Sequence, residues 1–346
     1  IRASLLVLTL LEFRSSPESE APLAESGVAV MSRTLNAQWD QEEQRFQEGD
    51  PIKSGRMKLK SGLVEIEFLS GACVIVEGPA DLELLSEDFA ICHEGKLRVF
   101  VPEPAKGFTI SAPRFDAVDL GTEFAMSVEN GGRSEVHVID GQVDLHGKDG
   151  SLLRNLHAGD AAGQGSQSGD LESMSADGDR FVNWKQLTEL KGQHSISRYE
   201  EWRNYRSRWA EDPDTILYYD FENQSPWERQ LRNARPGQPD GGIVGAQWVG
   251  GRWPEKSALE FKRTSDRVRL DVPGEWDSIS FAAWIRVEGL DRRHNALFLS
   301  DEWSRGETHW HIGEGGSLNF AINSVGRAKT EPLLGPSFLG RWLHIA

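Results

Sequence analysis

Two short runs place histidines and carboxylates where they could bind a metal ion. Glu307, His309 and His311 occupy alternate positions, so on an extended strand they share one face. Imidazoles at this spacing are suitable ligands for a transition metal. Asp220 and Glu222 have the same spacing and could offer oxygens to calcium from a strand edge. Each set could also be an exposed polar face, and the sequence leaves both interpretations open.

A third candidate site combines an indole with two carboxylates. Asp301, Glu302 and Trp303 follow the apolar run 297–299 and are therefore expected in a loop. An indole face can stack on a sugar ring while neighbouring carboxylates bind its hydroxyl groups. Loops of β-sandwiches often carry binding sites, although a solvated loop has the same composition.

Catalytic signatures do not accompany these residues. The sequence contains no GxSxG, HExxH, P-loop or GxGxxG motif, and its nine histidines are scattered. We therefore expect a protein without enzymatic activity. The residues require no cofactor, and calcium is the ion that Asp220 and Glu222 would suit.

Length and composition indicate a two-domain, turn-rich β protein. A chain of 346 residues suits two domains that each bury a core. The net charge of −16 makes nucleic acid and anionic membrane surfaces poor partners. The only cysteines, Cys73 and Cys92, lie in apolar runs and could be a disulfide between adjacent strands or two buried thiols.

The first residues are apolar. Residues 3–11 form a run of about half the ~20 residues that span a bilayer. Acidic, Ser and Pro residues follow at once in 12–25, which favours residues 1–11 as the end of a transmembrane helix and an exported remainder. The alternatives are a signal-segment remnant or an ordinary hydrophobic helix.

Residues 28–162 show the alternation typical of antiparallel strands. Residues 124–128 alternate apolar and polar side chains, and Asn130-Gly131-Gly132 then supplies a hairpin turn. In the run 63–68, Glu65 and Glu67 share one strand face. Paired carboxylates can do acid–base chemistry, but a solvated face is the expectation here.

The stretch 49–162 resembles the FecR domain. The resemblance rests on ordered elements: SGLVEIEF, SGACVIVEGPA, GFTISAP, DLGTEF, VHVIDGQVDL and LHAGDAA. It implies the extracytoplasmic β domain of a membrane-spanning regulator whose cytoplasmic segment controls a sigma factor. In such proteins an outer-membrane transducer supplies the signal.

Residues 163–213 are expected to be a linker. Gly, Ser and acidic residues dominate 163–179. Residues 181–190 could form a short helix, and residues 197–211 predict a stronger one that begins at Ser197 and ends before Asp212-Pro213. Its aromatic stripe, with Tyr199 and Trp202, could be a sugar platform or could dock on the following domain.

Residues 214–346 predict an antiparallel sandwich. Strands are expected at 216–222, 278–287, 295–300, 308–313 and 317–323, with 258–261 pairing with 268–272. The order of YYDFE, SALEF, DRVRL, SISFAAWIRV, NALFLSD and HWHIGEGGSLNFAI resembles the laminin-G-like, concanavalin A-like family. That resemblance implies a jelly roll that binds carbohydrate or protein, in some members through calcium.

Together these features predict an all-β protein: a FecR-like domain, a helical linker and a laminin-G-like sandwich. We expect an envelope-anchored regulator whose extracytoplasmic part binds a glycan or a protein ligand. The alternatives are a carbohydrate-active enzyme and a structural cell-surface protein of the same fold.

Overall fold

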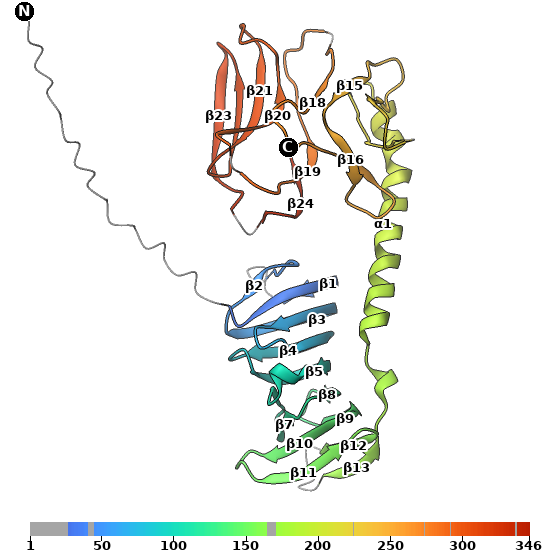
Figure 1. The fold of residues 1–346 in the computed structure, drawn as a ribbon, viewed down its shortest axis with the longest axis vertical. Coiled ribbons are helices and arrows are strands. Elements are labelled where there is room, and N and C mark those ends of the chain that lie inside the picture. Colours follow the sequence, from blue (N-terminus) through green and yellow to red (C-terminus); the bar gives the residue numbers. More distant parts are fainter. Residues whose placement is uncertain are drawn as a thin grey trace, which may run out of the picture. The chain divides into compact units, whose positions relative to one another are not determined.

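A computed structural model describes residues 27–40, 45–164, 171–223, 225–272, 274–290, 292–335 and 338–346 (Figure 1). The predicted membrane segment, residues 1–11, lies outside these ranges. Within the described residues, no helix is long and apolar enough to cross a membrane. The chain divides into two compact units, with unit 1 ending at Asn183 and unit 2 beginning at Trp184. The fold is all-β with a helical linker, as the sequence predicts.

Unit 1 is built around one branched sheet (Figure 1). Its path runs β11-β10-β7-β6-β5-β4-β3-β1-β2, and β8, β9, β12 and β13 branch from β5. The strands are β1 (Ala29–Trp39), β2 (Pro51–Ile52), β3 (Gly55–Phe68), β4 (Cys73–Leu84), β5 (Phe89–Phe100), β6 (Thr109–Ser111), β7 (Phe115–Asp119), β8 (Glu123–Val128), β9 (Ser134–Asp140), β10 (Gln142–Gly147), β11 (Leu152–His157), β12 (Asp160–Gln164) and β13 (Glu172–Ser175).

The sheet forks along β5. Its first part, from Phe89 to Ile91, pairs in parallel with β6, and its second part, from Gly95 to Phe100, pairs antiparallel with β8. The two arms approach again where β11 meets β9 and β12. They enclose an apolar core that includes Phe115, Phe124 and Leu145, all fully buried. Burial of this kind contributes about 25 cal/mol per Å² of apolar surface.

Glycines set two turns of this sheet. The predicted hairpin between β8 and β9 is present, and Gly131 and Gly132 both have positive φ. At Gly141, between β9 and β10, an added Cβ would lie 2.6 Å from the carbonyl oxygen of Gly121. This position therefore requires glycine for close backbone approach as well as for its φ of 81°.

Two details of unit 1 differ from expectation or settle an alternative. Glu65 was expected on a solvated face, but it is buried and pairs at 2.9 Å with Arg33, which lies directly opposite it on the neighbouring strand β1. Glu67 is exposed, as expected. Cys73 and Cys92 are both free thiols. They do not form the disulfide that was one of the two interpretations.

The segment expected as a linker contains regular structure. β13 adds to unit 1 by pairing with β12, and a short 3-10 turn, η3 (Gly178–Arg180), follows it. The helix α1 (Trp184–Glu211) ends where the sequence predicts, and it joins the two expected helices, 181–190 and 197–211, into one that begins at Trp184. The Gly- and Ser-rich composition did not predict β13, because this strand is held by backbone pairing with β12 and not by apolar side chains.

Unit 2 consists of α1 and several small antiparallel sheets. The sheets are β14-β15-β18, β16-β17, β19-β24 and β20-β21-β22-β23. Their strands are β14 (Gln230–Leu231), β15 (Gly241–Val244), β16 (Gln247–Gly250), β17 (Ser257–Glu260), β18 (Arg267–Arg269), β19 (Ala283–Arg286), β20 (His294–Leu299), β21 (Thr308–Gly313), β22 (Ser317–Ile322), β23 (Gly326–Pro332) and β24 (Trp342–Ile345).

Two predictions for unit 2 are wrong. Residues 216–222 do not form a strand, because the Asp220 carboxylate binds the backbone N–H of Glu222 and Phe221 has a φ of 55°, which ends strand pairing. The segments around 258–261 and 268–272 do not pair with each other. Instead β17 pairs with β16, and β18 pairs with β15, so both partners are earlier strands.

Candidate functional site

The loop between β20 and β21 presents a fixed indole. The Trp303 side chain is 59% exposed, and its ring packs edge-on against His309 with 4.2 Å between ring centroids. The Asn323 side chain donates to the backbone carbonyls of Trp303 and Ser304. Gly306 N–H in turn donates to the carbonyl of Asn323 at 2.9 Å. Because its backbone is tied to the β22–β23 turn, the loop can hold the indole in one orientation before a ligand binds.

Charged side chains belong to the same loop or pair with it. Asp301 forms an ion pair with Arg269 of β18, and both side chains are exposed. Glu302 accepts a hydrogen bond from the Ser304 hydroxyl at 3.3 Å, and its backbone carbonyl lies 3.2 Å from the Nε2 of His309. The three residues predicted as a ligand site therefore lie on one loop. Sequence analysis missed Arg269, which is distant in the chain and reaches the loop only through the fold.

The two predicted metal-binding histidines have different partners. The Nε2 of His311 lies 3.0 Å from the Nδ1 of His294, which is across the β20–β21 pair, whereas His309 contacts Trp303. Burial, and then the neighbouring His294 and His309, lower the pKa of His311, so it is neutral at neutral pH. Among the described residues, no group of three or more His, Cys, Asp or Glu side chains is arranged to hold a metal ion.

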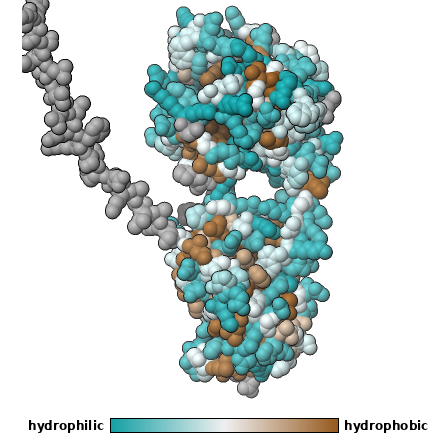
Figure 2. Space-filling view, viewed as in Figure 1, coloured by the Kyte–Doolittle hydropathy of each residue, from teal (hydrophilic) through white to brown (hydrophobic). Residues whose placement is uncertain are grey.

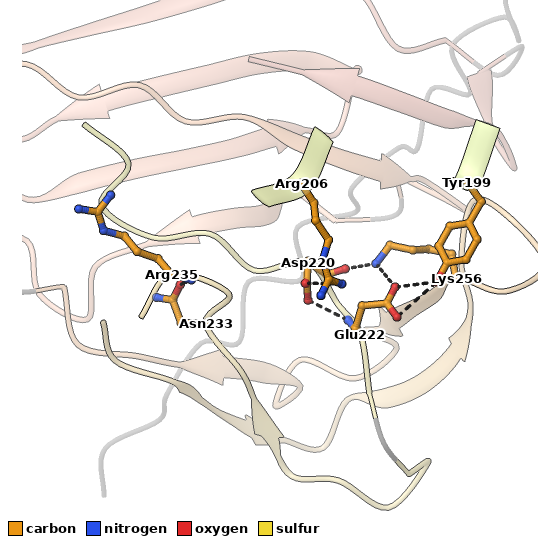
Figure 3. A network of polar contacts seen from close by, with 7 residues as sticks. All are labelled: Tyr199, Arg206, Asp220, Glu222, Asn233, Arg235 and Lys256. Atoms are coloured by element: carbon orange, nitrogen blue, oxygen red, sulfur yellow. Dashed lines mark hydrogen bonds and ion pairs between the residues drawn. The ribbon is translucent and has the colours of Figure 1, made fainter. Parts of the chain in front are cut away.

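Asp220 and Glu222, the predicted calcium ligands, belong to an ion-pair network (Figure 3). Arg206 of α1 lies 3.2 Å from Asp220, and Lys256 lies 3.0 Å from Glu222. Lys256 also donates to the backbone carbonyl of Asp220, and the Tyr199 hydroxyl lies 3.4 Å from both oxygens of Glu222. A cation at this place would compete with two basic side chains of the protein itself.

The aromatic stripe of α1 docks within unit 2 over part of its length. Tyr199 stacks on Trp202 with centroids 5.6 Å apart, and both rings contact Trp253 at about 6 Å. The Lys256 ammonium lies over the Trp202 ring at 4.2 Å, and burial lowers its pKa. Farther along α1, Trp209 is exposed. Tyr199 and Trp202 therefore fit the interpretation that the stripe docks on the following domain, and not the interpretation of a sugar platform.

Other indoles of unit 2 are exposed on a largely polar surface. Figure 2 shows a hydrophilic face with separate hydrophobic patches. Trp227 is 80% exposed, and Trp276 and Trp284 are also exposed. Trp284 is covered on one side by the Arg252 guanidinium, 3.5 Å from the ring centroid. Trp303 differs from Trp227 in its contact with an aromatic ring, that of His309, since aromatic side chains commonly line ligand sites.

Comparison with known proteins gives limited information. No family model and no curated protein matches the chain. Two crystal structures, at 2.50 and 1.65 Å resolution, of a candidate anti-sigma factor from Parabacteroides distasonis are similar to part of it. Each is 16% identical, has a TM-score of 0.31 and covers 35% of this chain, and the match spans 60% of the length of that protein. A likeness at this score carries no argument about the function of this chain.

Proposed function

We propose that this chain is the extracytoplasmic part of an envelope-anchored regulator of a sigma factor, and that its unit 2 binds a glycan. The proposal for unit 1 rests on the resemblance to the FecR domain. The ordered elements of that resemblance occupy consecutive strands of the branched sheet: EGPA is in β4, GTEF reaches into β8, VHVIDGQVDL covers β9 and β10, and LHAGDAA spans the β11–β12 turn. One continuous fold therefore contains them all.

The geometry of Trp303 is the observation that supports glycan binding. Its indole is exposed, its backbone is hydrogen bonded to Asn323, and Asp301 and Glu302 precede it on the same loop, where Asp301 pairs with Arg269. A sugar ring presents apolar C–H groups on one face and hydroxyls around its edge. The exposed indole would stack on the apolar face, and the carboxylates of the same loop and the guanidinium that pairs with Asp301 would bind the hydroxyls.

The proposed mechanism is ligand-dependent signalling. Ligand capture at unit 2 would favour one state of the extracytoplasmic part, and a membrane helix would report that state to a sigma factor on the other side. An outer-membrane transducer is a second partner, which would add a strand to an exposed sheet edge of unit 1. In this role the protein binds its ligand without chemical conversion.

Binding can be tested with the whole chain on a glycan array, with and without calcium, followed by titration of the best glycan. The proposal expects specific binding that Trp303→Ala reduces at least tenfold, while Trp227→Ala, which removes a more exposed indole, leaves it unchanged. Equal loss in both variants, or no glycan bound under either condition, would contradict it. Binding to a cell-surface protein in place of a glycan would also contradict it and would identify the ligand as a protein.

The regulatory part needs its own measurement. Deleting the gene in its native host should change transcription of the genes that one sigma factor controls. An unchanged transcriptome, together with a defect in cell-surface integrity, would support the structural-protein alternative.

A further inference from the structure

The last residues of unit 1 are fastened to its sheet by a compact set of contacts. Residues 177–181, which we call the clasp, include η3 and Phe181 and come shortly before α1 begins at Trp184. The Phe181 ring is 2% exposed and lies 5.3 Å from the ring of His137 on β9. Opening the clasp would thus expose an aromatic ring and release the chain that leads into unit 2.

Two arginines hold the clasp at its ends. Arg98 of β5 is buried and donates to the backbone carbonyls of Gly178, at 3.0 Å, and Phe181, at 3.3 Å, while its Nε pairs with Glu123. Arg180, within the clasp, lies 3.1 Å from the buried carboxylate of Glu135. Arg98 binds backbone carbonyls and not side chains. Its charge-assisted hydrogen bonds therefore fix the path of the backbone through the clasp.

His137 makes the contact that can titrate. Its side chain is 1% exposed, and its Nδ1 accepts a hydrogen bond from the backbone N–H of Asp177 at 3.2 Å. An imidazole nitrogen that accepts a hydrogen bond carries no proton, so the clasped state holds the neutral ring with its proton on Nε2. Protonation would place an N–H on Nδ1, directed at the N–H of Asp177, and that hydrogen bond would be lost.

The charges around His137 act in both directions. Arg180 opposes a positive charge on the ring, whereas Glu135, 3.6 Å from Nε2, and Asp177 favour it. Glu135 is already shared with Arg133 and Arg180, and these two arginines help to keep its own pKa low, so it stays ionised across the relevant pH range. Burial is the largest influence, and with Arg180 it lowers the pKa of His137 below 6.5.

We propose that the clasp is a pH-sensitive latch in which protonation of His137 releases residues 177–181 from the sheet. The clasped state binds the proton less readily than the open state, in which His137 is hydrated. Acidification below the ordinary range of histidine therefore shifts the equilibrium toward opening, by up to about tenfold for each pH unit. Neutral pH keeps the latch closed.

Hydrogen exchange of the whole chain provides the first test. Exchange rates of a peptide covering 177–183 are measured from pH 7.5 to 5.0 and corrected for intrinsic chemistry. We expect protection of this peptide to fall about tenfold or more at the acidic end, while peptides from β3 and β4 stay protected. His137→Gln can still accept the N–H of Asp177 but does not titrate, so it should abolish the pH dependence. His157→Gln, which replaces an exposed histidine of unit 1, should retain it.

A second measurement keeps the proposal testable if His137→Gln fails to fold. Nitrogen-15 labelling of the histidines in the unmodified chain reports the tautomer of His137 and the pH at which it protonates. The proposal requires a proton on Nε2 at neutral pH and a titration midpoint that coincides with loss of protection in the 177–183 peptide. A proton on Nδ1, opening at a different pH, or titration without opening would each overturn it.

Discussion

The two units bury their side chains in different ways. In unit 1, large side chains such as Phe68, Phe108 and Phe124 are fully buried in one continuous core. In unit 2, one compact cluster has only Leu231, Ile243 and Ala246 as its buried members, and half-buried aromatic side chains pack around it. Unit 2 also exposes several indoles.

This contrast suggests a division of tasks. A close-packed interior stabilises one arrangement and leaves little for a ligand to contact. Ring stacking and ion pairs at a partly exposed surface contribute less stability, but they leave aromatic faces and charged groups accessible. We propose that stability is concentrated in unit 1 and recognition in unit 2, and changes in each unit can test that separation.

The largest expected effect is in the core of unit 1. Phe124→Ala removes a fully buried ring and should lower the free energy of unfolding of unit 1 by about 3–5 kcal/mol. Phe281→Ala removes a half-buried ring of unit 2 that contacts Phe298 and Trp310, and it should cost less. Calorimetry of the whole chain compares them. Equal losses would show that the two interiors are equivalent.

A smaller loss is expected at the ion-pair network of unit 2. Lys256→Met keeps an aliphatic stem over Trp202 but removes the charge that faces Glu222, and it should destabilise unit 2 by about 1–2 kcal/mol. Lys262→Met is the matched control, because Lys262 pairs with Glu260 at 3.0 Å but is 75% exposed. Its effect should stay within about 0.5 kcal/mol. Indistinguishable thermal transitions for the two variants would contradict a stabilising role for the network.

A pH-dependent effect is expected from Asp119 in unit 1. Its carboxyl group is fully buried and accepts the N–H of Gly121 at 2.6 Å, and burial raises its pKa from 3.8 to about 7. The folded state thus binds a proton that the unfolded chain releases, so the stability of unit 1 should fall as pH rises from about 4 to 7 and level off above.

Asp119→Asn removes this titration. The variant should lose the corresponding slope in a plot of stability against pH and gain stability relative to the unmodified chain above pH 7. The exposed Asp149→Asn should leave the slope unchanged. A slope that persists in Asp119→Asn would assign it to other groups.

Strand alternation could be predicted from sequence because it depends on neighbouring residues. The hairpin at Gly131 and Gly132 is present, and on β21 the residues that alternate with His309 and His311, namely Trp310 and Ile312, are buried. Strand partners were less predictable. Glu65 faces Arg33 of the neighbouring strand β1, and β17 and β18 pair with earlier strands, which alternation along one segment cannot reveal.

The candidate site shows the same limit. Trp303 and its two acidic neighbours are adjacent in the chain and could be found by composition. Arg269, His294 and Lys256 act across long sequence separations, so only the fold identifies them as partners of predicted residues. The clasp was hidden for a second reason, because its Gly-rich approach resembles a flexible linker although Phe181 is buried.

The most direct test of the division between the units is glycan binding by Trp303→Ala measured together with its stability. We expect the variant to unfold within about 0.5 kcal/mol of the unmodified chain, because the indole is largely exposed. Its affinity for the glycan should fall by about 2 kcal/mol, or roughly 30-fold. Unchanged affinity, or a loss of affinity that accompanies unfolding of unit 2, would contradict the assignment of recognition to this loop.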